Sequence, residues 1–119
     1  TLDESPLLYE VEINKYDTPE IHKHLKRKKD LKLSLFKTSL RNRELNNNVV
    51  PLLLIRDENR ILIPSWDEDI LSKDKILFAC DKYAKNDMEY IIQNLYEFHY
   101  AYCGEEKRTI LKRMIKWKY

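Results

Sequence analysis

Three apolar runs separated by polar turns, within residues 49–80, constrain this chain more than any other feature. The runs Val49 to Arg56 and Arg60 to Ile63 flank the polar turn Asp57–Asn59, and such a short polar interval predicts a β-hairpin. The run Lys75 to Cys80 is nearly continuous in apolar residues, which indicates a strand buried on both faces. This part of the chain therefore predicts the centre of a small antiparallel sheet.

Pro51 lies near the start of the first of these strands. Proline has no backbone N–H to donate to a neighbouring strand, so within sheets it is confined to edges and bulges. We expect an edge or a bulge at this position.

The residues before this sheet predict a strand, a helix and a second strand. Apolar residues alternate with polar ones over 7–13, and the leucines alternate in the same way over 31–40. Between these segments Thr18 is a good N-cap and Pro19 suits the first helical position. We expect a short helix there, closed by the lysine-rich run 26–29.

Apolar residues after Asp81 recur at helical spacing and predict a helix that stops at Gly104, followed by a basic helix over 105–119. The order of elements is that of an α+β domain with a small, largely antiparallel sheet, a strand–helix–strand start and C-terminal helices. We divide the chain into a domain over residues 1–82 and a helical extension over 83–119.

Composition narrows the functional classes. The net charge of +2, from 22 basic and 20 acidic residues, argues against general nucleic-acid binding. The only glycine is Gly104, which excludes every glycine-rich loop that cradles a phosphate. No stretch approaches the ~20 apolar residues of a membrane-spanning helix. The two cysteines, Cys80 and Cys103, are expected to be reduced thiols in a cytosolic compartment.

The histidines and the acidic loop do not form a convincing metal site. His22 and His24 lie on opposite sides of the predicted helix, so we interpret them as an exposed pair. His99 lies on an apolar helical stripe and is interpreted as a residue at the edge of the core. The cluster Asp67–Asp69 lacks the alternating oxygens and glycine of an EF-hand, so we expect a solvated loop.

Two acidic pairs invite comparison with metal-dependent nucleases, which place carboxylates and a lysine on adjacent strands. The residues concerned are Asp57, Glu58, Asp74 and Lys75. Both pairs lie at turns, where aspartate is a good turn former, so the structural interpretation is favoured. We predict no catalytic residues, no metal site and no enzymatic activity. A metal-dependent hydrolase remains the third class considered.

One helical stripe and an excess of tyrosine point to an interface. We predict a homodimer with much of its contact on the stripe Met88, Ile91, Ile92, Leu95 and Phe98. Tyrosines and basic residues in the last third also suit a small nucleic-acid-binding protein, our alternative function. The basic amphipathic segment Glu105 to Tyr119 carries Trp117 near its end, a pattern that also suits contact with an anionic membrane surface; packing on its own dimer with the lysines in solvent is the favoured interpretation.

The motifs in residues 49–81 follow a known order. Ile55-Arg56-Asp57 ends a strand, Ile63-Pro64 ends the next, and an acidic loop, a corner from Leu71 to Asp74 and an apolar strand follow. This order resembles the TrkA-C domain, the C-terminal lobe of RCK (regulator of K+ conductance) proteins, over about residues 7–82. The chain departs from the family where Lys73 replaces the usual glycine before the corner aspartate, and where lysine and arginine replace a glycine near the opening helix.

The resemblance implies a cytoplasmic regulatory domain at the inner face of the membrane. It would dimerise or join a larger RCK assembly, contact a membrane pore subunit or domain, and gate potassium flux when an effector shifts its arrangement. The effector is unknown, and a nucleotide, a cyclic dinucleotide or a cation are the candidates. By position, the resemblance implies an effector site at Ile61, Leu62, Ile63 and Pro64.

Overall fold

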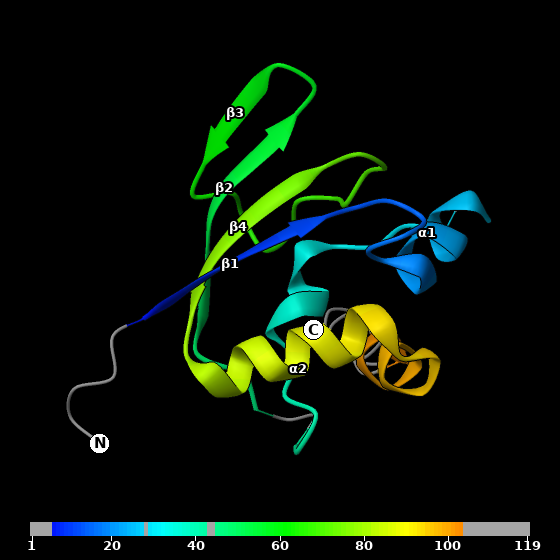
Figure 1. The fold of residues 1–119 in the computed structure, drawn as a ribbon, viewed down its shortest axis with the longest axis vertical. Coiled ribbons are helices and arrows are strands. Elements are labelled where there is room, and N and C mark those ends of the chain that lie inside the picture. The colour runs from blue at the N-terminus through cyan, green and yellow to red at the C-terminus, as the bar shows by residue number, and fades with distance from the viewer. Residues whose placement is uncertain (1–5, 28, 43–44, 104–119) are drawn as a thin grey trace, which may run out of the picture.

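The computed structural model describes residues 6–27, 29–42 and 45–103 of the chain (Figure 1). Its elements follow one another in the order β1 (Leu7–Glu12), α1 (Pro19–Lys26), the 3-10 helix η1 (Leu33–Lys37), β2 (Val49–Arg56), β3 (Asn59–Leu62), β4 (Lys75–Cys80) and α2 (Lys82–Gln93). Residues 95–103 form a further helical segment. The α+β fold predicted from the sequence is confirmed.

The four strands form one antiparallel sheet in the order β1-β4-β2-β3. The predicted hairpin is present as β2 and β3. The register of β2 on β4 shifts between Pro51 and Leu53, so the predicted irregularity at the proline is a bulge. β3 pairs with β2 only from Leu53 onward. On the β3 side of the sheet, Pro51 therefore has no paired residue to which a backbone N–H would donate.

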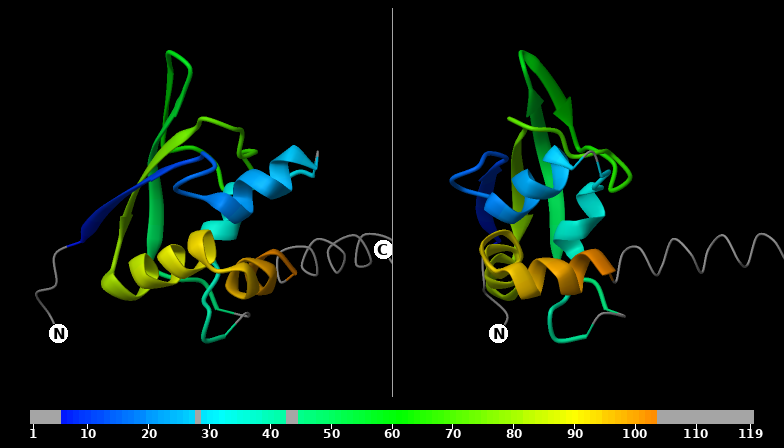
Figure 2. Two further views of the ribbon diagram at one scale, coloured as in Figure 1. Left: turned by 45° about the vertical axis from the view of Figure 1, so that its right-hand side comes forward. Right: turned by 90° about the vertical axis from the view of Figure 1, so that its right-hand side faces the viewer.

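The helices of the described residues all lie on one side of the sheet, as the views in Figure 1 and Figure 2 agree. The inner face of the sheet packs against them, and the buried side chains of both layers form one hydrophobic core. On β4 this face is made by Ile76, Phe78 and Cys80, whereas Leu77 and Ala79 on the other face are only half-buried. The prediction that β4 is buried on both faces is therefore wrong, because helices cover only one of them.

The predicted second strand over residues 31–40 is a 3-10 helix instead. Its residues Leu33, Ser34, Leu35 and Phe36 are all buried, so the alternating pattern ends after Leu33. The backbone N–H of Leu33 donates to Glu68 and that of Ser34 to Trp66, so the segment pairs with a loop rather than with the sheet. Consecutive burial of this kind suits a short helical turn enclosed by the core, whereas a strand on a sheet with one uncovered face would bury alternate residues.

The C-terminal helix predicted to run to Gly104 is interrupted at Asn94. The side-chain Oδ1 of Asn94 accepts from the N–H groups of Tyr96 and Glu97, at 2.9 and 3.2 Å, which caps the following segment 95–103. Both helical segments contribute to the core described above, through Met88 and Phe98 among others. The predicted boundary at residue 82 therefore does not separate two cores within the described residues.

Three non-glycine residues adopt positive φ: Asp57 at 57°, Ile63 at 46° and Lys73 at 72°. Asp57 is in the hairpin turn, where aspartate tolerates this conformation. Lys73 occupies the position where the resembling family usually has glycine. Its positive φ is a conformation that glycine adopts without steric cost. Ile63 is the most strained of the three, because a β-branched side chain disfavours this region strongly.

Replacing Lys73 by glycine should stabilise the fold. The left-handed backbone costs a lysine about 1 kcal/mol that glycine does not incur, partly offset by the entropy of glycine in the unfolded chain. We expect the free energy of unfolding in urea to rise by roughly 0.5–1 kcal/mol. The control is Lys75→Gly on the extended strand β4, which should lower the free energy of unfolding. A lower free energy of unfolding for both variants would contradict the left-handed conformation of Lys73.

Candidate functional site

The most strongly organised polar site joins the end of β2 to the corner before β4. Arg56 donates from Nε to Oδ1 of Asp74 at 3.0 Å and from Nη2 to Oδ2 at 2.9 Å, a two-point ion pair. The same Nη2 donates to the carbonyl of Asp69 at 2.8 Å. Asp74 is 1% exposed and its Oδ2 also accepts from the N–H of Leu71 at 2.8 Å. We call these contacts the Arg56–Asp74 clamp.

The clamp also reaches the first strand. The carbonyl of Asp74 accepts from the N–H of Ile13 at 2.8 Å, and the N–H of Lys73 donates to the carbonyl of Ile13 at 2.9 Å. Hydrogen bonding to Asp74 raises the pKa of the Arg56 guanidinium, so the cation is secure at every physiological pH. A buried carboxylate that accepts from both an arginine and the backbone N–H of Leu71 is a structural group rather than a free catalytic base.

The nuclease-like quartet is not assembled. Asp74 is buried in the clamp, whereas Lys75 is exposed and Asp57 and Glu58 lie exposed in the hairpin turn. The acidic loop is also engaged: Lys32 contacts Asp69 at 2.7 Å, and Glu68 lies 3.9 Å from Arg56. No group of three metal-ligating side chains occurs within the described ranges. The residues that suggested a metal centre therefore do not converge.

The residues predicted to hold an effector lie at the free edge of the sheet. Leu62 and Ile63 are 76% and 63% exposed, Ile61 is half-buried and Pro64 is buried. Ile63 is held in its strained conformation by its own N–H, which donates to the carbonyl of Leu52 at 2.9 Å. These four residues are absent from the linings of four surface cavities in the described part of the chain. Leu62 and Ile63 form an exposed apolar ridge.

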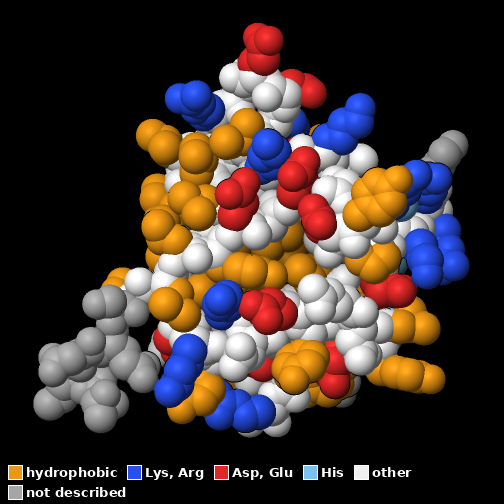
Figure 3. Space-filling model, viewed as in Figure 1, with side chains coloured by type: hydrophobic (Ala, Val, Ile, Leu, Met, Phe, Trp, Pro, Cys, Tyr) orange, Lys and Arg blue, Asp and Glu red, His pale blue; other side chains and the backbone are white. Residues whose placement is uncertain are grey.

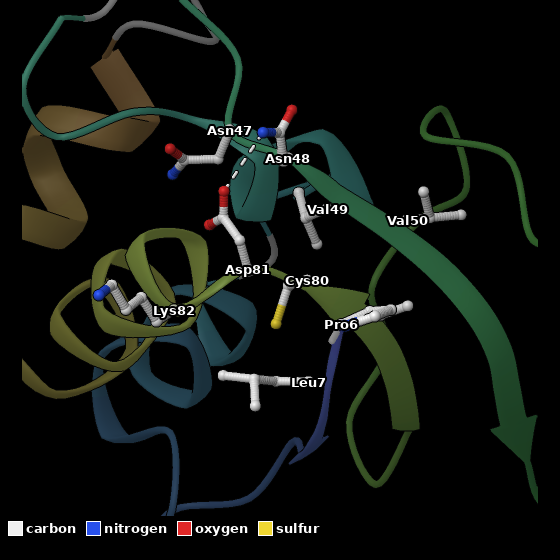
Figure 4. A pocket seen from close by; sticks show the side chains of 10 residues that line it. Pro6, Leu7, Asn47, Asn48, Val49, Val50, Cys80, Asp81 and Lys82 are labelled. Carbon is white, nitrogen blue, oxygen red and sulfur yellow. Dashed lines mark hydrogen bonds between the residues drawn. The ribbon is translucent and has the colours of Figure 1, made fainter. Parts of the chain in front are cut away.

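The largest cavity described is a groove of about 790 Å³ at the other end of the sheet (Figure 4). Its floor is apolar, and the polar residues Asn47, Asn48, Asp81 and Lys82 stand at its rim. The Cys80 sulfur points toward Leu7 in this view. The polar residues Asn47 and Asn48, just before β2, line this groove, whereas Leu62 and Ile63 do not.

The rim of the groove is already hydrogen-bonded within the chain. Asp81 caps α2 by accepting from the N–H of Ala84 at 2.8 Å, and its other oxygen accepts from Nδ2 of Asn48 at 3.2 Å. Nδ2 of Asn47 donates to Asp87 at 2.9 Å. Burial and the nearby Asp81 raise the pKa of the Cys80 thiol, which keeps it protonated and unreactive. The groove therefore suits an apolar group better than a charged one.

The histidines differ from expectation. His24 is 6% exposed and packs edge-on against the rings of Phe98 and Tyr102, at centroid distances of 5.5 and 4.5 Å. It joins α1 to the C-terminal helical segment, so it is a core residue rather than half of an exposed pair. His99, predicted at the core edge, is exposed. Both cysteines are free thiols, Cys80 buried and Cys103 exposed.

The stripe predicted for dimerisation is part of the core of the single chain. Met88, Ile91, Ile92 and Phe98 are at most 5% exposed, so their side chains are not available to a second copy in this arrangement. Only Leu95, at 46% exposed, remains accessible. The long apolar stripe is explained by the sheet, which needs two helical segments to cover its inner face.

The surface that sequence reasoning missed is the outer face of the sheet, opposite the helices. Its apolar side chains are Leu8, Val50, Leu53, Ile55, Leu62 and Leu77, of which Leu8, Val50 and Leu62 are 67%, 49% and 76% exposed. Figure 3 shows hydrophobic side chains gathered over β2 and β3 on the left of the view. The alternate residues of β2 and β4 are largely apolar too, which is the pattern of strands buried on both faces, so the sequence did not reveal this uncovered face.

None of the known family models, curated proteins or solved structures compared with the chain matches it. Within the described residues no helix is long and apolar enough to cross a membrane. The basic segment 105–119, on which membrane contact and the nucleic-acid alternative largely depend, lies outside the described residues.

Removing the arginine of the clamp should destabilise the protein strongly. Arg56→Met leaves the Asp74 carboxylate buried without its cation, and breaking one side of a buried pair costs about 3–5 kcal/mol. The measurement is the free energy of unfolding in urea. The matched control is Lys32→Ala, whose ion pair with Asp69 is half-exposed and should contribute no more than about 1 kcal/mol. Equal effects of the two substitutions would show that the clamp has no special role.

Proposed function

We propose that this chain is a non-enzymatic regulatory domain of a potassium channel or potassium transporter. The observation that carries the proposal is the Arg56–Asp74 clamp. Two residues of the motifs on which the TrkA-C resemblance rests, Arg56 and Asp74, meet in one two-point ion pair in which the carboxylate is buried. Lys73, where the family usually has glycine, has the φ of 72° that favours glycine. A chance similarity of short motifs would not require these positions to be structurally coupled.

Such a domain acts through its surfaces rather than through chemistry. The polar side chains with the strongest partners, Arg56, Asp74 and Asp81, are engaged within the fold, which argues for a rigid body. The exposed apolar ridge at Leu62 and Ile63 is where the resemblance implies effector contact. In this proposal the domain works at the inner face of the cell membrane, pairs with further copies and transmits an effector-dependent shift to a pore.

The strain at Ile63 supports a role for the ridge. Backbone conformations that cost about 1–3 kcal/mol persist where the surroundings hold them, and they cluster at functional sites. Here the hydrogen bond to Leu52 and the buried Pro64 hold the backbone, while the side chain of Ile63 is directed into solvent. An isoleucine kept exposed in a strained conformation contributes little to the fold, so its contribution is expected to be to binding.

An effector that binds the native domain should raise its melting temperature. A ligand at a hundredfold excess over its dissociation constant stabilises a protein by about 2.7 kcal/mol. We expect one of the cyclic dinucleotides, mononucleotides, Na+, K+, Ca2+ or Mg2+ to shift the transition by several degrees. Ile63→Asp should abolish that shift by removing the apolar side chain from the ridge, and it should still fold, because aspartate tolerates the left-handed backbone. Leu45→Asp, at an exposed aliphatic residue away from the ridge, should preserve the shift. The absence of any shift across the panel would count against an effector site.

Deletion of the gene should alter potassium transport. The measurement is the initial rate of rubidium uptake by the host at limiting potassium, with the uptake of a labelled amino acid as the control. We expect a several-fold change in rubidium uptake alone, restored by expression of the full reading frame that carries this chain. Unchanged rubidium uptake after deletion would make the proposed function wrong.

A further inference from the structure

The strand β1 has a partner strand on one side only, because it pairs with β4 and is the first strand in the sheet order. The residue after it, Ile13, directs both its N–H and its carbonyl to the corner before β4, at 2.8 and 2.9 Å. Successive residues of a strand direct these groups to opposite sides. The residues of β1 whose N–H and carbonyl point away from β4 are therefore Leu8, Glu10 and Glu12. Within the described residues these three make no backbone hydrogen bond outside the sheet.

A groove of about 590 Å³ runs along this open edge. Its lining includes all of the consecutive residues Tyr9–Glu12. Successive side chains of a strand point to opposite faces, so a cavity that all of them line follows the edge of the strand instead of lying over one face. The other side of the groove is formed by residues 16–19 and by Ile92 and Gln93 at the end of α2. The edge is thus accessible to another extended segment.

The turn that forms one wall of this groove is fixed by hydrogen bonds of its own. Oδ1 of Asn14 accepts from the N–H groups of Tyr16 and Asp17, at 2.8 and 2.7 Å, and Nδ2 of Asn14 donates to Asp17 at 2.9 Å. The buried Thr18 donates from Oγ1 to the carbonyl of Asn14 at 3.0 Å. The wall is therefore formed before any partner binds, which lowers the entropic cost of binding.

The charged side chains that line the groove are all acidic: Glu10, Glu12 and Asp17. Glu10 and Glu12 are exposed, and neither belongs to an ion pair within the described residues, although Lys75 lies opposite Glu12 on β4. A strand added beside β1 would place alternate side chains next to these two glutamates. Opposite charges at such cross-strand positions stabilise a pair, and like charges destabilise it. The edge therefore favours a segment with basic residues two positions apart.

We propose that β1 binds an extended basic segment of a partner protein, which adds to the sheet as a further strand antiparallel to β1. Lysines or arginines at alternate positions of that segment lie beside Glu10 and Glu12. The residue between them lies opposite Val11 and faces the groove, where the burial of Val11 and Ile92 favours an apolar side chain. Main-chain hydrogen bonds supply the affinity and the alternate side chains the specificity. The antiparallel direction continues that of the three existing ladders.

The charge of this edge disfavours other occupants. A second copy that paired edge to edge through β1 would bring Glu10 and Glu12 of both chains together, and like charges across strands are destabilising. Nucleic acids and anionic lipid surfaces bind basic residues, so these acids repel them. The docking surface is independent of the proposed potassium role, because it lies on β1 whereas the ridge at Ile63 follows β3, the opposite edge strand.

The first test measures binding of the whole chain to a short synthetic peptide in which lysine and valine alternate, by the fluorescence anisotropy of the labelled peptide. We expect saturable binding, and binding at least about tenfold weaker for the double variant Glu10→Lys, Glu12→Lys, because two cross-strand pairs change from opposite to like charge. The control Glu58→Lys, Asp67→Lys changes the net charge equally at exposed acids elsewhere. At physiological salt it should bind within about twofold of the wild type, because distant charges are screened.

A second test leaves the protein unaltered and changes the peptide backbone. In the proposed pairing the N–H groups of the lysines donate to β1 and those of the valines point away. N-methylation at the lysines should therefore abolish binding, whereas N-methylation at the valines should preserve it. Binding of the unmodified peptide should slow the hydrogen exchange of the N–H groups of Leu8, Glu10 and Glu12, measured by NMR.

Several results would overturn the proposal. These are the absence of peptide binding, equal weakening by the two double variants, and equal effects of the two N-methylated peptides. Slow exchange of the same N–H groups without peptide would show that another segment or a second copy already covers the edge, and would also overturn it. Circular dichroism of each variant shows whether it is folded. Peptide binding together with unaltered rubidium uptake on deletion would support this surface while contradicting the potassium role.

Discussion

The Arg56–Asp74 clamp is the interaction on which the rest of the structure depends. It fixes the end of β2, the corner before β4 and, through the carbonyl of Asp74, the residue after β1. Three strands that are distant in sequence are therefore aligned by one ion pair at their common end. An isolated buried charge is costly, so neither residue is tolerable without the other. This requirement explains why the arginine follows one apolar run directly and the aspartate precedes the next.

The elements that were predictable from the sequence are those whose pattern is local. The hairpin of β2 and β3, the start of α1 at Pro19 and the irregularity near Pro51 follow from turn residues and from the chemistry of proline. The 3-10 helix was not predictable in this way. Residues 31–35 alternate as a strand does, and only the hydrogen bonds of Leu33 and Ser34 to the loop around Glu68 select the helical turn.

The candidate surfaces were less predictable than the fold, for a physical reason. A stripe of large apolar residues on a helix has the same sequence pattern whether it packs on a sheet of its own chain or on a second copy. Here Met88 and Ile91 meet the sheet and are fully buried. The outer face could not be recognised from the sequence either, because β2 and β4 are apolar on both faces. Only the placement of all the helices on one side leaves that second face uncovered (Figure 2).

The one-sided fold constrains what the protein can do. Helices fill the inner side of the sheet with hydrocarbon, and the polar groups at the corner and at the groove are saturated by partners within the chain. The outer face of the sheet is left as a largely apolar surface, with Glu10 and Glu12 on β1 at one edge, Arg60 on β3 at the other, and the strained Ile63 beside it. Large exposed apolar surfaces on small domains mark sites of association. In the function we propose, such a domain would transmit movement, because a shift at one contact displaces every strand that the Arg56–Asp74 clamp holds together.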